Sequence, residues 1–154
     1  MNNTKEKCVI VHVDGACSGN PGFGGWAYVI KYNDVTVAMA GREDTTTTNS
    51  RMELTAALKA LNRCIKILSI KDRDINTPIH IHSDSRYVVN IMNGMFKKIN
   101  VNNDLVLDIR AANKKANVTW IQVPRNSTEQ MEVCDNLAKE ASKKPEFKWE
   151  EKVI

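Results

Sequence analysis

The sequence lacks the cysteine pairs that would form a disulfide framework or bind a structural zinc ion. Its four cysteines, Cys8, Cys17, Cys64 and Cys134, are far apart and form no CxxC motif. Three of them lie within apolar segments, which is typical of reduced thiols in a cytosolic type of protein. We therefore expect neither disulfides nor a zinc site.

Long apolar runs, repeats and linkers are also absent from the 154 residues. No run approaches the roughly 20 apolar residues of a transmembrane helix, and residues 1–7 are polar, unlike a signal peptide. We expect a soluble, cytoplasmic monomer without membrane contact. The length fits a single domain over residues 1–154, with a core at about 7–142 and a frayed C-terminal tail at 143–154.

Positive charge is only mildly in excess: the chain has 22 Lys and Arg residues and 18 Asp and Glu residues, which gives a net charge of +4. This excess is compatible with a polyanionic partner such as nucleic acid, but it does not establish one.

What the sequence does contain is a strand pattern followed by alternating helices and strands. Residues 8–13 are β-branched and apolar, which is typical of a strand buried on both faces. Residues 25–32 and 35–41 predict two more strands, joined by a tight turn at 33–34 into an antiparallel meander. The later elements are predicted as helix 50–68, strand 79–83, helix 85–92, a helix after 102–104, strand 118–123 and helix 129–142. This order predicts an α/β fold with a five-stranded mixed sheet, its first three strands antiparallel, flanked by helices.

Asp14 stands at the end of the first apolar run, before a glycine-rich segment at 15–25 that we predict to be a loop. An ionised carboxylate removed from water costs several kcal/mol unless a cation or hydrogen-bond donors compensate it. Ordinary Asp-Gly turn chemistry is one explanation for this residue. The glycine-rich segment is longer than a turn requires, which favours close approach of the backbone to another group.

Three further acids each have a structural explanation. Glu53 fits a capping box with Ser50, and Asp84 fits the N-cap of the helix that follows it. Asp135 lies four residues before Lys139, a surface ion pair worth only about 0.3–0.5 kcal/mol.

Taken together, the acids indicate a metal site. Asp14 and Asp84 both follow strands, and the carboxyl ends of parallel neighbours meet at one edge of a sheet, where ligands gather in α/β folds. Carboxylates that converge without a lysine or arginine among them repel one another unless hard cations lie between them. Oxygen ligands select Mg²⁺ or Mn²⁺, and two such ions are typical of phosphoryl-transfer nucleases.

The chain resembles the ribonuclease H type 1 family over about residues 9–141. Four blocks carry the resemblance, at residues 14–22 with 24–26, 48–54 with 56–57, 83–88 and 134–138. The resemblance implies the ribonuclease H-like fold and an endonuclease that hydrolyses the RNA strand of RNA/DNA hybrids with two Mg²⁺ ions, for which Mn²⁺ can substitute. Its metal-binding acids fall on Asp14, Glu53, Asp84 and Asp135, with Asp14 bridging both ions.

The resemblance also implies substrate contacts. Positions that contact the minor groove of the hybrid match Asn20, Asn49 and Ser50, with Ser18 beside them, and the DNA phosphate pocket matches Thr48. Small amide and hydroxyl groups suit this role, because they can bond the 2′-hydroxyl that distinguishes RNA from DNA.

Lysine side chains are candidates for phosphate contacts, because the charged backbone dominates affinity for nucleic acid. The candidates are Lys97 and Lys98. For Lys114 and Lys115, a solvated lysine-rich surface is an equally good explanation.

Two features depart from the family pattern. The loop at 123–132 holds no histidine where the family has one, and Asn126 falls nearest that position. Because asparagine does not titrate near neutral pH, we expect slower turnover or an altered pH profile. The segment 94–101 is too short for the basic protrusion of many bacterial members, so we expect weaker, more salt-sensitive binding.

Two functions remain open from the sequence. One is a metal-dependent endonuclease specific for hybrids, which the four acids favour because their mutual repulsion destabilises a protein that binds no metal. The other is a module that binds RNA/DNA hybrids with little or no turnover. A purely structural domain leaves the glycine-rich segment unexplained.

Overall fold

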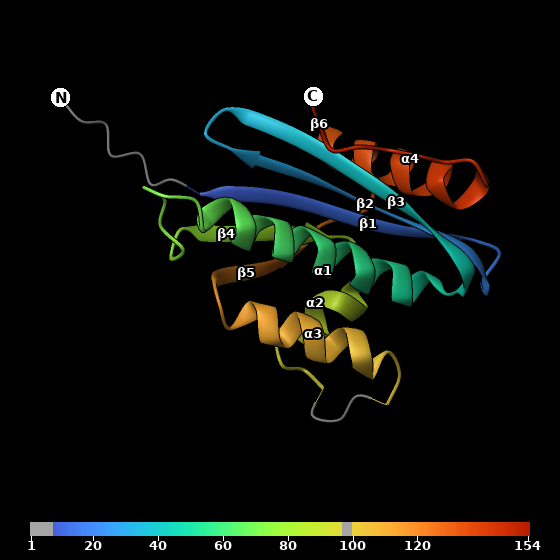
Figure 1. The fold of residues 1–154 in the computed structure, drawn as a ribbon. Helices are drawn as coiled ribbons and strands as arrows, with labels where there is room; N and C mark the ends of the chain where they lie inside the picture. The colour runs from blue at the N-terminus through green and yellow to red at the C-terminus, as the bar shows by residue number, and fades with distance from the viewer. Residues whose placement is uncertain (1–7, 97–99) are drawn as a thin grey trace.

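The structure is a computed structural model that describes residues 8–96 and 100–154. A six-stranded sheet in the order β5-β4-β1-β2-β3-β6 forms the centre of the fold. Helices cover both faces of the sheet: α1, α2 and α3 lie on one side and α4 lies on the other (Figure 1). The predicted α/β architecture, a mixed sheet flanked by helices, is therefore confirmed.

The strand pattern follows the prediction in its order and direction. Strands β1 (Val9–Ser18), β2 (Gly22–Tyr32) and β3 (Val35–Thr47) form the antiparallel meander. Strands β4 (Pro78–Ser83) and β5 (Asn117–Gln122) extend the sheet beyond β1 in parallel. Val9, Val11 and Val13 of β1 lie in the main core on one face of the sheet, and Ala16 packs against the smaller core on the other face.

The predicted count of five strands and the predicted frayed tail are both wrong. The sixth strand, β6 (Lys152–Val153), pairs antiparallel with β3 at the edge of the sheet. Trp149 donates its indole N–H to the Ala38 carbonyl at 3.1 Å, and Phe147 and Trp149 pack against the core beneath α4. Burying these two aromatic side chains provides the free energy that orders a tail of otherwise mixed charge.

The helices begin and end close to the predicted positions. They are α1 (Asn49–Leu68), α2 (Arg86–Met92), α3 (Asn103–Asn113) and α4 (Glu129–Lys143). The main core lies between the sheet and α1 to α3, and a smaller core lies between the sheet and α4. Within the described residues, no helix combines the length and apolar character needed to cross a membrane. Cys17, Cys64 and Cys134 are free thiols.

The glycine-rich segment 15–25 is a β-hairpin, where a loop was predicted. Its glycines allow the helices to approach the sheet closely. A Cβ atom at Gly15 would overlap the backbone of Met52 and Glu53 in α1. A Cβ atom at Gly25 would overlap the Ala138 carbonyl oxygen in α4. The hairpin therefore fixes the position of both helices that carry predicted site residues.

Candidate active site

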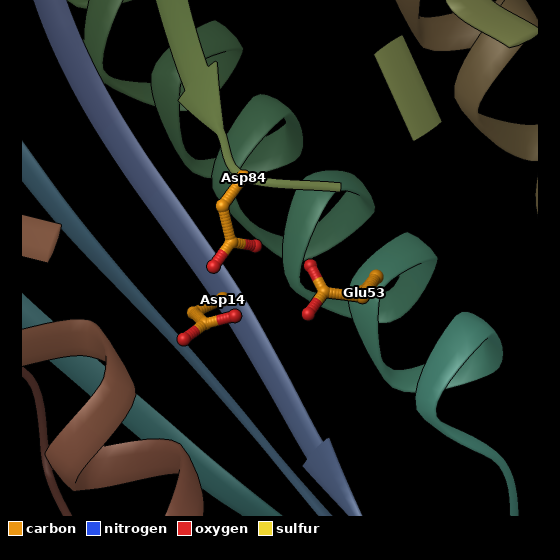
Figure 2. A group of neighbouring side chains, drawn as sticks. All are labelled: Asp14, Glu53 and Asp84. Carbon is orange, nitrogen blue, oxygen red and sulfur yellow. The ribbon is translucent and has the colours of Figure 1, made fainter. Parts of the chain in front are cut away.

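Three carboxylate side chains converge at one point beside the sheet. Asp14 comes from β1, Glu53 from α1 and Asp84 from the residue after β4, and Figure 2 shows their carboxyl groups pointing toward one another. One oxygen from each lies within 4.8 Å of the others. Among the described residues, this is the single group of three or more acidic, histidine or cysteine side chains with such spacing.

The parallel pairing of β1 and β4 brings the two aspartates together. Val13 of β1 pairs with Ser83, the last residue of β4. The residues that follow them, Asp14 and Asp84, are therefore neighbours. The expectation that parallel neighbours bring these residues together is confirmed. Asp14 is not at the end of its strand, however, because β1 continues to Ser18 in its pairing with β2.

Glu53 reaches the site because α1 packs directly on Gly15. The Gly15 amide donates to Asp14 Oδ1 at 2.9 Å and to Glu53 Oε1 at 3.1 Å. The predicted capping box is wrong, since the N-cap of α1 is Thr48, whose hydroxyl accepts from the Arg51 amide. Glu53 Oε2 is buried and has no hydrogen-bond donor within the described part of the chain. Within the described residues, the Gly15 amide is therefore the donor to Oε1 of this carboxylate, and Oε2 is left without one.

Asp84 does not cap the helix that follows it. The N-cap of α2 is Ser85, whose hydroxyl accepts from the Val88 amide at 3.2 Å. The structural explanation offered by the sequence for Asp84 is thus wrong, and its carboxylate is left to face Asp14 and Glu53 (Figure 2).

Asp135 of α4 lines one cavity together with the three carboxylates but is not part of the three-carboxylate group. Lys139 Nζ is 2.9 Å from Asp135 Oδ2, so the predicted pair within α4 is confirmed. Arg125 Nη2 is 3.8 Å from Asp135 Oδ1. The premise that no lysine or arginine lies among the acids is therefore wrong at Asp135. This residue is 7 % exposed, which is unusual for a simple surface pair.

Burial and mutual repulsion raise the pKa values of the converging acids. The pKa of Asp14 is raised to about 7, first by burial and then by the charges of Asp84 and Asp135. Burial and the charge of Asp14 hold the pKa of Glu53 well above its ordinary value. Burial also raises the pKa of Asp84, although the Arg125 charge opposes this shift. The site is therefore unfavourable for three bare negative charges.

The residues present fit a divalent cation. The candidate ligand atoms are carboxylate oxygens. One of them, the buried Glu53 Oε2, accepts no hydrogen bond from the described residues. A set of oxygen ligands without sulfur or imidazole suits Mg²⁺ or Mn²⁺. A cation there would remove the repulsion that raises these pKa values.

The acids open onto a cavity of about 530 Å³. Asn49, a predicted substrate contact, lines it, and so do residues that were not predicted as site residues: Cys17, Arg125, Lys139, Ser142 and Lys143. The sequence feature that could have indicated Arg125 as a site residue is its position in the 123–132 loop, which lacks the family's histidine. Asn126, the residue predicted there, is exposed with φ 53° and does not line the cavity.

The other predicted substrate residues lie around the start of α1. Asn20 Oδ1 accepts from the Asn49 amide at 3.3 Å, which links the β1–β2 turn to the helix. Ser18 is exposed at the end of β1, and Ser50 is half-buried in the first turn of α1. Lys97 and Lys98 lie outside the described residues.

Comparison with known proteins identifies the family. The family model described as RNase H matches residues 6–143. The chain belongs to the ribonuclease H family. It is therefore an enzyme of the nuclease class of hydrolases.

Curated ribonucleases H resemble this ribonuclease H over nearly their full length. One from Caldanaerobacter subterraneus subsp. tengcongensis is 38 % identical, over 94 % of this chain and 96 % of its own. One from Francisella philomiragia subsp. philomiragia is also 38 % identical, over 90 % of this chain and 93 % of its own.

Solved structures of ribonucleases H share the fold. The N-terminal RNase H domain of a Mycobacterium tuberculosis protein superposes with a TM-score of 0.75 at 23 % identity, covering 88 % of this chain and 94 % of that one. LC11-RNase H1, in complex with an RNA/DNA hybrid, gives a TM-score of 0.72 at 23 % identity, covering 86 % of this chain and 95 % of that one.

Proposed function

We propose that this ribonuclease H is an endonuclease that hydrolyses the RNA strand of RNA/DNA hybrids with two divalent cations, Mg²⁺ or in substitution Mn²⁺. The observation that carries the proposal is the convergence of Asp14, Glu53 and Asp84 within 4.8 Å. The family membership and the hybrid complex of LC11-RNase H1 support the choice of substrate.

The acids divide into two kinds in this proposal. Asp14, Glu53 and Asp84 would hold metal directly, and Asp14 is the acid whose pKa is raised by the charges of both Asp84 and Asp135. Asp135 would join the metal set once its pairs with Lys139 and Arg125 loosen. Bound divalent ions supply a water nucleophile of lowered pKa and stabilise the charge on the leaving oxygen.

The cations at the rim have a separate role. Arg125 is 65 % exposed and lines the cavity with the acids. A guanidinium in that position binds the phosphate that is cleaved and stabilises the extra charge of the transition state. We propose that Arg125, and not Asn126, is the residue of this loop that acts at the site.

Substrate choice follows from the polar groups beside the cavity. Asn20 and Asn49 are held together by a hydrogen bond, and both carry amides that can donate to a 2′-hydroxyl or accept from it. Ser18 and Ser50 add hydroxyl groups, and Thr48 is close to the start of α1, where backbone amides favour a phosphate. These contacts distinguish an RNA strand from DNA without reading its sequence.

The proposal is tested with an end-labelled RNA/DNA hybrid, with Mg²⁺, Mn²⁺ or chelator, beside single-stranded RNA and duplex DNA. We expect metal-dependent cutting of only the hybrid's RNA strand, abolished by Asp14→Asn. Asp104→Asn, at an exposed acid outside the site, is the matched control and should cut normally. Hybrid binding without cleavage in either metal would refute the proposal and identify a binding module.

A thermal melt reports metal binding separately from turnover. If Mg²⁺ binds the native acids at ten times its Kd, it stabilises the fold by about 1.4 kcal/mol. The wild type and Asp104→Asn should show this increase in Tm, and Asp14→Asn should not.

A further inference from the structure

A second cavity of about 500 Å³ lies along the opposite stripe of α1, away from the acids. Its floor is formed by Trp26 and Tyr28 of β2 and Met39 of β3. Its wall is formed by Lys59, Asn62, Arg63, Ile65 and Lys66 of α1 and by Ser69, the C-cap of that helix. None of these residues lines the cavity that contains Asp14.

The floor offers an aromatic surface held in a fixed position. The rings of Trp26 and Tyr28 are nearly parallel, at 21°, with centroids 6.2 Å apart. The Trp26 ring lies over Gly41, where a Cβ atom would overlap it. Tyr28 is held by its hydroxyl, which donates to Glu151 Oε2 at 2.8 Å. Tyr28 is only 4 % exposed, so the accessible ring is that of Trp26. A fixed aromatic face of this kind stacks with nucleobases regardless of sequence.

The wall offers two positive charges without an acidic partner among the described residues. Lys59 Nζ lies 5.4 Å from the centre of the Trp26 ring, and Lys66 is exposed two turns further along α1. Seven residues of helix place the two lysines on one stripe about 10 Å apart. Arg63 differs from them, because Glu151 accepts from it at 2.9 Å and compensates its charge.

We propose that this cavity binds single-stranded nucleic acid, with a base stacked on Trp26 and the phosphate backbone along Lys59 and Lys66. The aromatic floor and the cationic wall meet the two requirements of such a site, and the negative charge of the strand complements the lysines. The strand comes either from a flank of the hybrid or from a separate molecule. The site does not depend on the carboxylates or on metal.

The test measures binding of fluorescein-labelled oligothymidylate to the full chain in chelator. Lys59→Gln/Lys66→Gln should weaken binding about tenfold and reduce the salt slope by about 1.4, since each phosphate contact on a single strand contributes about 0.7. Trp26→Leu should weaken binding about tenfold as well, through loss of base stacking. Lys31→Gln/Lys71→Gln removes the same charge at two exposed lysines elsewhere and should bind as the wild type does.

The outcomes separate this site from the active site. Binding that the Lys59/Lys66 variant leaves unchanged, or that the Lys31/Lys71 control weakens equally, would overturn the proposal even if Trp26→Leu fails to fold. AMP binding as tight as the oligonucleotide would also overturn it, in favour of a mononucleotide site. Cleavage of a blunt hybrid is measured in parallel and should be unchanged in the lysine variant; failure of all cleavage would count against the nuclease proposal alone.

A final comparison identifies the source of the strand. If KM is lower for a hybrid with a single-stranded overhang than for a blunt one, and the lysine variant removes the difference, the strand is the substrate's own flank. If free oligothymidylate binds without any such difference in KM, the strand is a separate molecule. Both results support the site.

Discussion

Gly15 and Glu53 are in direct contact: the Gly15 amide donates to Glu53 Oε1 at 3.1 Å, and a Cβ atom at Gly15 would overlap the Glu53 backbone. The same amide donates to Asp14 Oδ1 at 2.9 Å. One backbone N–H therefore sets the separation of two carboxylates, although Glu53 lies 38 residues along the chain from Gly15.

Gly15→Ala should inactivate the enzyme without removing a catalytic group. The added methyl displaces α1 and with it Glu53, and a displacement of about 1 Å at such a site costs about 100-fold in rate. The measurement is hybrid cleavage together with urea unfolding. Ala60→Gly, at a buried position of α1 distant from the acids, is the control: it should lose about 1 kcal/mol of stability but keep its cleavage rate. Equal activity of Gly15→Ala and wild type would contradict the packing described.

Stability in chelator should fall as pH rises from about 4 to above 7. The pKa of Asp14 is raised from 3.8 to about 7, so the folded state holds a proton that the unfolded state has already released. The stabilisation is complete below pH 4 and is lost as pH passes 7.

Asp14→Asn isolates this effect from other titrations. Because it removes the buried charge, it should stabilise the metal-free protein at pH 8 by an amount on the order of 2 kcal/mol and much less at pH 4. Urea unfolding at both pH values measures the difference. A variant that is equally or less stable than the wild type at pH 8 would refute the assignment.

Arg125→Gln should reduce kcat by about tenfold, a smaller loss than that of a buried oxyanion donor because the guanidinium is largely exposed. Asn126→Gly, which accepts the positive φ of that residue, should change kcat less than threefold. Steady-state kinetics of the two variants tests the assignment. The reverse ranking would restore Asn126 as the functional residue of the loop.

Glu151→Gln should destabilise the fold by about 1 kcal/mol. This carboxylate accepts from Tyr28 and from Arg63, and so joins the tail to β2 and α1, but partial exposure weakens the ion pair. Glu150→Gln makes the same change at an exposed neighbour and should be neutral within about 0.5 kcal/mol. Deleting residues 144–154 should cost more, about 3 kcal/mol, because Trp149 is also lost. The measurement is thermal unfolding. An equal loss of stability in Glu150→Gln and Glu151→Gln would contradict this account.

The sequence alone determined the order and type of the elements from β1 to α4 and the acids that the structure brings to one cavity. It could do so because apolar periodicity and turn chemistry are local properties. The hairpin turn at Asn33 and Asp34, where both residues have positive φ, is one example.

Only the tertiary structure decided which groups the acids contact. Local patterns suggested caps for Glu53 and Asp84, but Thr48 and Ser85 are the caps, and the two carboxylates face Asp14 instead. The same holds for Arg125 beside Asp135 and for Glu151 bound to Tyr28 and Arg63. These contacts join residues that are distant in the chain, so their geometry depends on how the sheet and helices pack, which no local pattern specifies.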